Sequence, residues 1–160
     1  MSGKNFDQIV LEQFHFLITD YGFKFVKKRE ENWGYDIVFL NATTGVHVIY
    51  EFREAYIFIM LYRLINGKLV ENPSPITENS VLNAFCLDDI VTIKNPDATM
   101  KPAYYYGIES EFYNKEQGMT LYVSKFADNL KIYAADVLTG NFEIFTELDQ
   151  IVKKRAKQAR

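Results

Sequence analysis

The chain has 160 residues, of which 48% are hydrophobic and 24% charged, and its net charge at pH 7 is −3. This composition excludes a disordered or fibrous chain, and the length suits one domain, 1–160, with its own hydrophobic core. The single cysteine cannot form an internal disulfide, and the N-terminus lacks the pattern of a signal peptide. The longest apolar run, Tyr56 to Tyr62, is far shorter than the ~20 residues of a membrane span. We therefore expect a cytoplasmic protein without membrane association.

The charge is unevenly distributed along the chain. The last eight residues, KKRAKQAR, hold five basic groups and no acidic one, so residues 1–152 carry 13 Lys+Arg against 21 Asp+Glu, a balance of −8. A body of this sign repels nucleic acid phosphates. We interpret the tail as the solvated end of a helix, where basic side chains interact favourably with the C-terminal partial charge, and we expect no nucleic acid partner.

The first predicted element is an amphipathic helix from Phe6 to Tyr21. Its apolar residues recur at steps of three and four, and Gly22 suits the left-handed position that ends a helix. From Phe23 the pattern alternates and leads into KKREEN, which is too charged to be buried on both faces. This stretch predicts an edge strand that is protected by its charges.

Three further strands are predicted over Tyr35–Asn41, Val46–Arg53 and Tyr56–Ile65. Asn66-Gly67 is typical of a type I′ turn, which would return the chain into a strand over Lys68–Glu71. The connections are short, and a parallel crossover needs a dozen residues or more, so the pairing should be antiparallel.

Helical spacing returns in the second half of the chain. Predicted helices run from Ser80 to Asn95, from Thr120 to Leu138 and from Phe142 to Lys157, with a mixed helix and loop region between the first two. The sum is an α+β fold: an N-terminal helix, a four- or five-stranded antiparallel meander, and C-terminal helices packed on one sheet face.

Residues with catalytic potential lack a recognisable arrangement. The two histidines, His15 and His47, belong to no metal-binding spacing, and the apolar and acidic neighbours of Cys86 raise a thiol pKa. Asp88 and Asp89 are adjacent on a predicted helix and point in different directions. No phosphate-binding loop, nucleophile elbow or dinucleotide fingerprint is present. We expect no metal and no cofactor, and the pattern leans away from an enzyme.

Two groups of residues are candidates for binding a protein partner. Glu51 and Arg53 share the outer face of a predicted strand, where a solvent-facing ion pair is the plainer interpretation. The segment PAYYYGIESEFYN combines aromatic and acidic side chains, which favour interface cores and attract basic partners, although partial burial would explain them as well. The candidate residues in this segment are Tyr105, Tyr106, Glu109, Glu111 and Tyr113.

Three stretches carry a resemblance to a known group of proteins: FHFLITDYGF from Phe14, YEFRE from Tyr50 and AADVLTGNFEIF from Ala134. They are similar to small bacterial proteins, some of which are regarded as immunity proteins against polymorphic toxins. The resemblance implies a noncatalytic, cytoplasmic protein that neutralises a toxin by binding it, and it transfers no functional residue.

Three hypotheses about function follow. The first is an immunity or antitoxin-type module whose acidic, tyrosine-rich surface covers a basic effector. The second is a small-ligand binder or unrecognised enzyme, with a pocket between sheet and helices lined by Tyr50, Arg53 and Tyr62. The third is a structural or self-associating component, since the sequence leaves the oligomeric state open.

Overall fold

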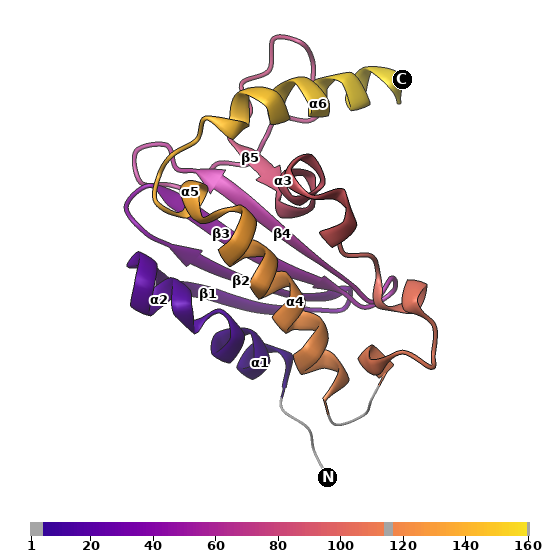
Figure 1. The fold of residues 1–160 in the computed structure, drawn as a ribbon. Helices are drawn as coiled ribbons and strands as arrows, with labels where there is room; N and C mark the ends of the chain where they lie inside the picture. Colours follow the sequence, from indigo (N-terminus) through magenta and orange to yellow (C-terminus); the bar gives the residue numbers. More distant parts are fainter. Residues whose placement is uncertain (1–4, 114–116, 160) are drawn as a thin grey trace.

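The computed structural model describes residues 5–113 and 117–159 and has the predicted α+β architecture (Figure 1). The strands are β1 (Lys24–Glu31), β2 (Gly34–Leu40), β3 (Thr44–Glu51), β4 (Tyr56–Arg63) and β5 (Ala84–Cys86). The α-helices are α1 (Phe6–Gln13), α2 (His15–Tyr21), α3 (Leu87–Lys94), α4 (Gly118–Tyr133), α5 (Ala135–Leu138) and α6 (Ile144–Gln158). Short 3-10 helices are η1 (Pro96–Ala98), η2 (Ala103–Tyr106) and η3 (Glu111–Tyr113).

The five strands form one antiparallel meander in the order β1-β2-β3-β4-β5. Helices α1, α2 and α4 lie across one face of this sheet, which we call the helix-covered face, and α6 lies beyond β5 (Figure 1). We call the other side the opposite face. β1 forms the border of the sheet, all its residues are exposed, and a bulge interrupts its register between Phe25 and Lys27. Charge and a bulge are the expected protection of an edge strand, so this prediction is confirmed.

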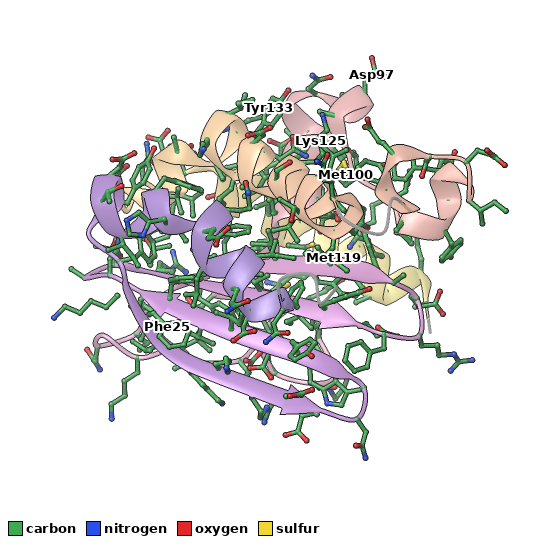
Figure 2. All side chains as sticks on the ribbon, turned by 90° about the horizontal axis from the view of Figure 1, so that it is seen from below. Phe25, Asp97, Met100, Met119, Lys125 and Tyr133 are labelled. Carbon is green, nitrogen blue, oxygen red and sulfur yellow. The ribbon has the colours of Figure 1, made fainter. Side chains whose placement is uncertain are left out.

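The hydrophobic core lies between the helix-covered face and the helices, where side chains fill the space (Figure 2). Successive residues of a strand point to opposite faces, so alternate positions enter the core. The core residues of the central strands are Ile37, Phe39, Val46, Val48, Ile57, Ile59 and Leu61. Each such side chain contributes roughly 1.5–3 kcal/mol when fully buried, and together they hold the sheet against α4.

Two of the predicted long helices are each divided in two. The N-terminal helix is interrupted at Phe14, and the helix predicted over Thr120–Leu138 is interrupted at Ala134. Both residues are buried and leave the helical backbone conformation, so apolar spacing continues across each break. Gly22 ends α2 in the left-handed conformation with φ 70°, as predicted. In the described residues, no helix has both the length and the apolar character that a bilayer span requires.

The fifth strand differs from the prediction. Asn66 and Gly67 both have positive φ and form the expected tight turn, but only one bridge, Ile65 to Lys68, follows it. The place beside β4 is taken by Ala84–Cys86, a stretch that the sequence assigned to a helix. The side chain of Asn72 binds the backbone of this strand at the N–H groups of Asn83 and Ala84 and at the carbonyl of Ala84. The helix therefore begins at Leu87 and not near Ser80, while its predicted end at Asn95 is correct.

Candidate functional site

The fold brings the two predicted partner-binding groups to one end of the molecule. Glu51 ends β3, and Arg53 lies in the turn that leads to β4. The N–H of Ala103 donates to the carbonyl of Ala55 in the same turn, at 3.1 Å. This bond joins the turn to residues 101–112, which we call the tyrosine-rich segment. Two segments about 50 positions apart in the sequence are thus neighbours at this end of the molecule.

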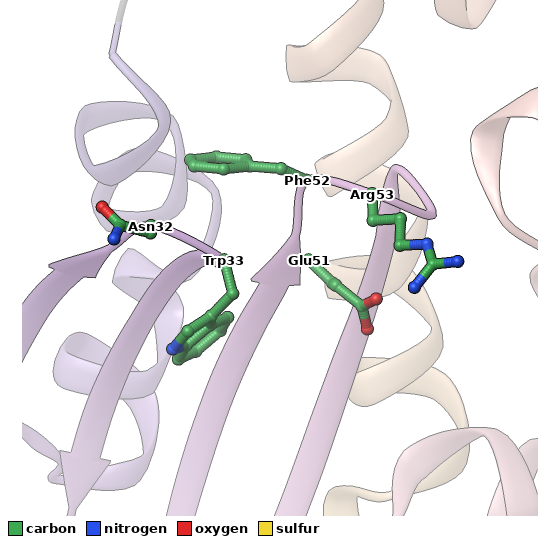
Figure 3. A pocket seen from close by; sticks show the side chains of 5 residues that line it. All are labelled: Asn32, Trp33, Glu51, Phe52 and Arg53. Atoms are coloured by element: carbon green, nitrogen blue, oxygen red, sulfur yellow. The ribbon is translucent and has the colours of Figure 1, made fainter.

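Glu51 and Arg53 do not share a strand face as expected. The strand ends at Glu51, so Arg53 is placed by the following turn, and its guanidinium lies on the side of Glu51 away from Trp33 (Figure 3). Neither side chain takes part in an ion pair within the described residues, and the two charged groups are more than 4 Å apart. The predicted pair between them is therefore wrong, because a two-residue spacing aligns side chains only while the chain stays extended.

The tyrosine-rich segment exposes large apolar side chains. Tyr104 is 54%, Tyr105 66% and Ile108 80% exposed, while Glu109 and Glu111 beside them face water. Isolated apolar residues are common on surfaces, but several together beside acidic groups are typical of an interaction site. The sequence singled out the tyrosines and glutamates of this segment and missed Ile108, which has the largest exposure.

The segment is anchored to the core by a series of aromatic contacts. Tyr106 packs edge-on against Phe112 at 4.9 Å between ring centroids, Phe112 against Tyr122 at 5.2 Å, and Tyr122 against Phe126 at 5.2 Å. The N–H of Lys101 also donates to the hydroxyl of Tyr106. Tyr106 therefore holds the segment in place, while its neighbour Tyr105 faces outward. The side chain of Tyr113 lies outside the described residues.

A shallow hollow of about 650 Å³ lies at the same end of the sheet (Figure 3). Asn32, Trp33, Glu51, Phe52 and Arg53 line it. Trp33 and Phe52 are joined by a backbone hydrogen bond of 2.8 Å, and both side chains are more than two-fifths exposed. No sequence pattern connects these residues with Glu51, although the position of the only tryptophan of the chain, next to a predicted charged edge strand, is a usable signal.

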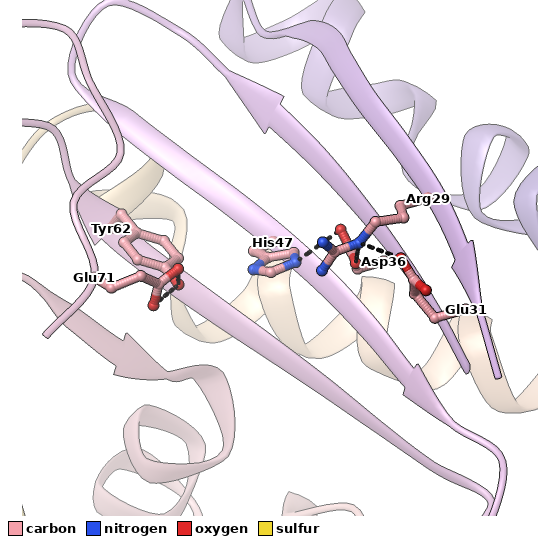
Figure 4. Close-up of polar contacts among 6 residues, drawn as sticks. All are labelled: Arg29, Glu31, Asp36, His47, Tyr62 and Glu71. Atoms are coloured by element: carbon pink, nitrogen blue, oxygen red, sulfur yellow. Dashed lines mark hydrogen bonds and ion pairs between the residues drawn. The ribbon is translucent and has the colours of Figure 1, made fainter. Parts of the chain in front are cut away.

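A polar row crosses the opposite face of the sheet (Figure 4). Asp36 is only 1% exposed and accepts a hydrogen bond of 2.8 Å from Nε of Arg29. Its second oxygen lies 3.4 Å from Nε2 of His47, close enough for attraction but poorly aligned for a hydrogen bond. Burial lowers the pKa of His47, and the charge of Asp36 opposes this shift. The row therefore balances one buried carboxylate mainly with an arginine.

An Asp–His pair raises the question of acid–base catalysis. A general base must reach the proton that it removes, within about 3 Å or through one water. Both ring nitrogens of His47 are buried, and the hydroxyl of Tyr62, the nearest aromatic neighbour, donates to Glu71 at 2.9 Å. The geometry leaves the imidazole without access to a substrate, so a structural interpretation of this pair is favoured.

A second titratable group lies where α3 packs against β4. The hydroxyl of Tyr56 donates to Oδ2 of Asp88 at 2.5 Å, while Oδ1 is buried without a partner in the described residues. Burial raises the pKa of Asp88 to about 6, although the bond from Tyr56 acts in the other direction. Asp89 points in a different direction from Asp88, as their adjacent positions on a helix predicted. Its carboxylate accepts a hydrogen bond of 2.8 Å from Arg155.

Cys86 precedes Asp88, and burial together with the Asp88 charge raises the pKa of its thiol to about 12. A thiol with this pKa is almost fully protonated at pH 7, so it is a poor nucleophile. Among the residues that the structure describes, no group of three or more histidine, cysteine, aspartate or glutamate side chains is placed to hold a metal ion. Another hollow, of about 410 Å³, contains Asp97, Met100 and Lys125 (Figure 2) and has charges of both signs.

The pocket proposed between sheet and helices is not formed by the residues expected to line it. Tyr50 points to the helix-covered face and packs against Phe6 at 5.0 Å between centroids. Tyr62 lies on the opposite face, and Arg53 lies in a turn. Tyr50 and Tyr62 are an even number of positions apart, but they belong to different strands, and their register sets them on opposite sides.

Residues 153–158 of the basic tail form the end of α6, and their charges meet acidic side chains of α3, of the loop before β5 and of α6 itself. Arg155 binds Asp89 at 2.8 Å, Lys153 binds Asp149 at 2.9 Å, and Lys157 lies 3.5 Å from Glu78. These contacts reduce the positive charge that a nucleic acid would meet, in keeping with the interpretation of the tail as a helix end.

Comparisons with known proteins assign the chain to no family. The chain matches no protein-family model, no curated protein and no solved structure.

Proposed function

We propose that this chain is a noncatalytic protein-binding module of immunity or antitoxin type, which acts in the cytoplasm by covering a basic effector protein. The observation that carries the proposal is the tyrosine-rich segment, where Tyr104, Tyr105 and Ile108 expose more than half of their surface beside Glu109 and Glu111. Tyrosine is enriched in interface cores because it buries a large area and keeps a polar tip.

The negative charge of the chain supports a partner of positive charge. The chain has a net charge of −3, and its tail cations are partly neutralised by Asp89, Asp149 and Glu78. A negative body attracts a basic protein over long range and increases the rate of association, an effect that salt weakens. Glu109 and Glu111 place two carboxylates directly beside the exposed aromatic side chains.

The anchoring of the segment supports the same proposal. Tyr106 and Phe112 connect it to Tyr122 and Phe126 in the core, so Tyr105 and Ile108 stay exposed although the rest of the segment is packed. Removing exposed apolar groups from a packed segment changes the free energy of folding of the protein only slightly. Their substitution can therefore separate binding from stability.

The test compares three immobilised proteins in a lysate of the source cells. One is the natural chain, one carries Tyr105→Ala with Ile108→Ala, and one carries Ile132→Ala, which removes a side chain with 66% exposure from α4 as a matched control. We expect one basic protein to bind the natural chain and the control stoichiometrically and to be lost with the double variant. With the purified partner, calorimetry should show an affinity loss of more than tenfold, because exposed aromatic anchors dominate interfaces.

Circular dichroism and thermal unfolding establish that the double variant is folded. Recovery of the same partner by all three proteins would contradict the proposal, as would the absence of any partner that depends on the segment. A partner of acidic character would contradict the electrostatic part.

A further inference from the structure

A gap next to Glu51 lies at the end of the sheet. The cross-strand partner of Glu51 is Gly34. A Cβ at position 34 would lie 1.7 Å from the carbonyl oxygen of Tyr50, so the close approach of the two strands requires glycine there. The N–H of Phe52 donates to the carbonyl of Trp33 at 2.8 Å, so this close approach and the hydrogen bond together place Trp33 beside the end of β3.

The two side chains that border this gap differ in chemistry. Trp33 and Glu51 both project over the same side of the sheet, whereas the guanidinium of Arg53 points away from the indole (Figure 3). We call this space the Trp33–Glu51 notch. The indole is 42% exposed, and the carboxylate has no ion pair in the described part of the chain.

An aromatic face next to a carboxylate is a receptor for an organic cation. The negative face of an indole attracts a cation within about 6 Å, and a carboxylate binds a guanidinium through two parallel hydrogen bonds. Glu51 and Arg53 contribute one charge of each sign to the lining, and the guanidinium lies on the side of Glu51 away from the indole (Figure 3). The part of the notch between the indole and Glu51 therefore suits a positively charged ligand.

We propose that the Trp33–Glu51 notch accepts one basic side chain, preferentially an arginine, from the protein partner. This inference rests on the proposed function, since the side chain belongs to the effector that the tyrosine-rich segment covers. Arginine fits better than lysine because its planar group can stack on the indole and bind Glu51 with two N–H groups at once. The hydrogen bond from Ala103 to Ala55 joins the turn after Glu51 to the segment, so the notch and the segment border the same end of the sheet, and a partner that wraps around this end can contact both.

The experiment uses the fluorescence of Trp33, which is the only tryptophan of the chain and therefore reports on the notch alone. The full chain is titrated with N-acetyl-arginine methylamide, with the lysine analogue, and with the citrulline analogue, which keeps the shape and lacks the charge. We expect a saturable change with the arginine probe at millimolar concentration, roughly the strength of one cation–π contact and one ion pair. The lysine probe should bind more weakly and the citrulline probe not at all.

Two variants give the specificity of the response. Glu51→Gln should weaken the arginine probe at least tenfold, whereas Arg53→Gln, which removes a nearby cation, should leave its affinity equal or higher. Circular dichroism verifies that both variants keep the fold. An equal response to citrulline, an unchanged affinity in Glu51→Gln, or no saturable response would each overturn the inference.

The small probes contain no effector, so their failure does not touch the proposed function, which the Tyr105 and Ile108 variants test. With the purified partner, Glu51→Gln should reduce the affinity severalfold, whereas Glu54→Gln, which removes a carboxylate of the same turn outside the lining of the notch, should leave it unchanged. If the arginine probe binds but the partner binds Glu51→Gln with unchanged affinity, the partner does not occupy the notch. This result would overturn the inference that the notch accepts a side chain of the partner.

Discussion

The two faces of the sheet bury their residues by different means. The helix-covered face meets α1 and α4 through aliphatic and aromatic side chains such as Val48 and Ile59. Among the described residues, helices α1, α2 and α4 lie on the other side of the sheet (Figure 1), yet Asp36 on the opposite face is almost completely buried beneath the side chain of Arg29. The difference shows that a sheet face without helices need not be a wet face. Long side chains from an edge strand can cover a carboxylate that packing against a helix would exclude.

The largest expected effect is on the free energy of unfolding, and it differs between two neighbouring residues of β4. Ile59 points into the core and is 1% exposed, while Met60 lies on the opposite face and is half-buried. Ile59→Ala should lower the free energy of unfolding by about 2–5 kcal/mol, because it removes buried methyl groups and leaves a cavity. Met60→Ala should cost roughly 1 kcal/mol, since less area is lost. Urea unfolding measures both, and equal losses would mean that the two faces contribute alike.

A smaller effect is expected at the border between the faces, where Tyr56 meets Asp88. The pKa of Asp88 rises from 3.8 to about 6 on folding, so the folded state binds the proton more tightly. The free energy of unfolding should therefore fall as pH rises from about 4 to 6, by about 2 kcal/mol from this group. Asp88→Asn should remove this fall, and Asp89→Asn should keep it. A pH series of urea unfolding curves with the same slope in all three proteins would contradict the assignment.

The smallest effect concerns the opposite face. Burial lowers the pKa of His47, so the unfolded state takes up the proton more readily as pH falls below 6.5. This group stabilises the fold above that pH and loses its contribution below it, and the effect is small because Asp36 opposes the shift. Relative to the natural chain, His47→Gln should lose less stability between pH 7 and pH 5. The exposed His15→Gln serves as control, and identical pH curves for both variants would show that His47 does not titrate differently on folding.

The sequence predicted those parts of the fold in which local pattern and tertiary environment agree. The alternation of Val46 to Tyr50 and the Asn66-Gly67 turn carry their structure in a few residues, and both are found. The strand over Ala84–Cys86 was missed because its position depends on Asn72, which binds its backbone from a distant loop. Helical spacing through Leu82 and Phe85 was therefore misleading, since burial at these positions comes from sheet and helix contacts together.

The candidate site was predictable in composition but not in assembly. Tyr105 and Glu109 were conspicuous from their sequence neighbourhood alone. The contact that joins their segment to the turn after Glu51 is one backbone hydrogen bond, from Ala103 to Ala55, which no side-chain pattern announces. The notch next to Glu51 brings Trp33, from the turn before β2, beside the end of β3, and this neighbourhood becomes visible only when the strand register is known.

The aromatic series from Tyr106 to Phe126 has a consequence for the thermodynamics of association. A loop that is ordered only on binding loses conformational entropy at that moment, which reduces the affinity it can reach. Because Phe112 and Tyr122 already fix the backbone beneath Ile108, most of that entropy is lost during folding. The segment is thus preorganised, and its dissociation from a partner should be slow for the small area that it offers.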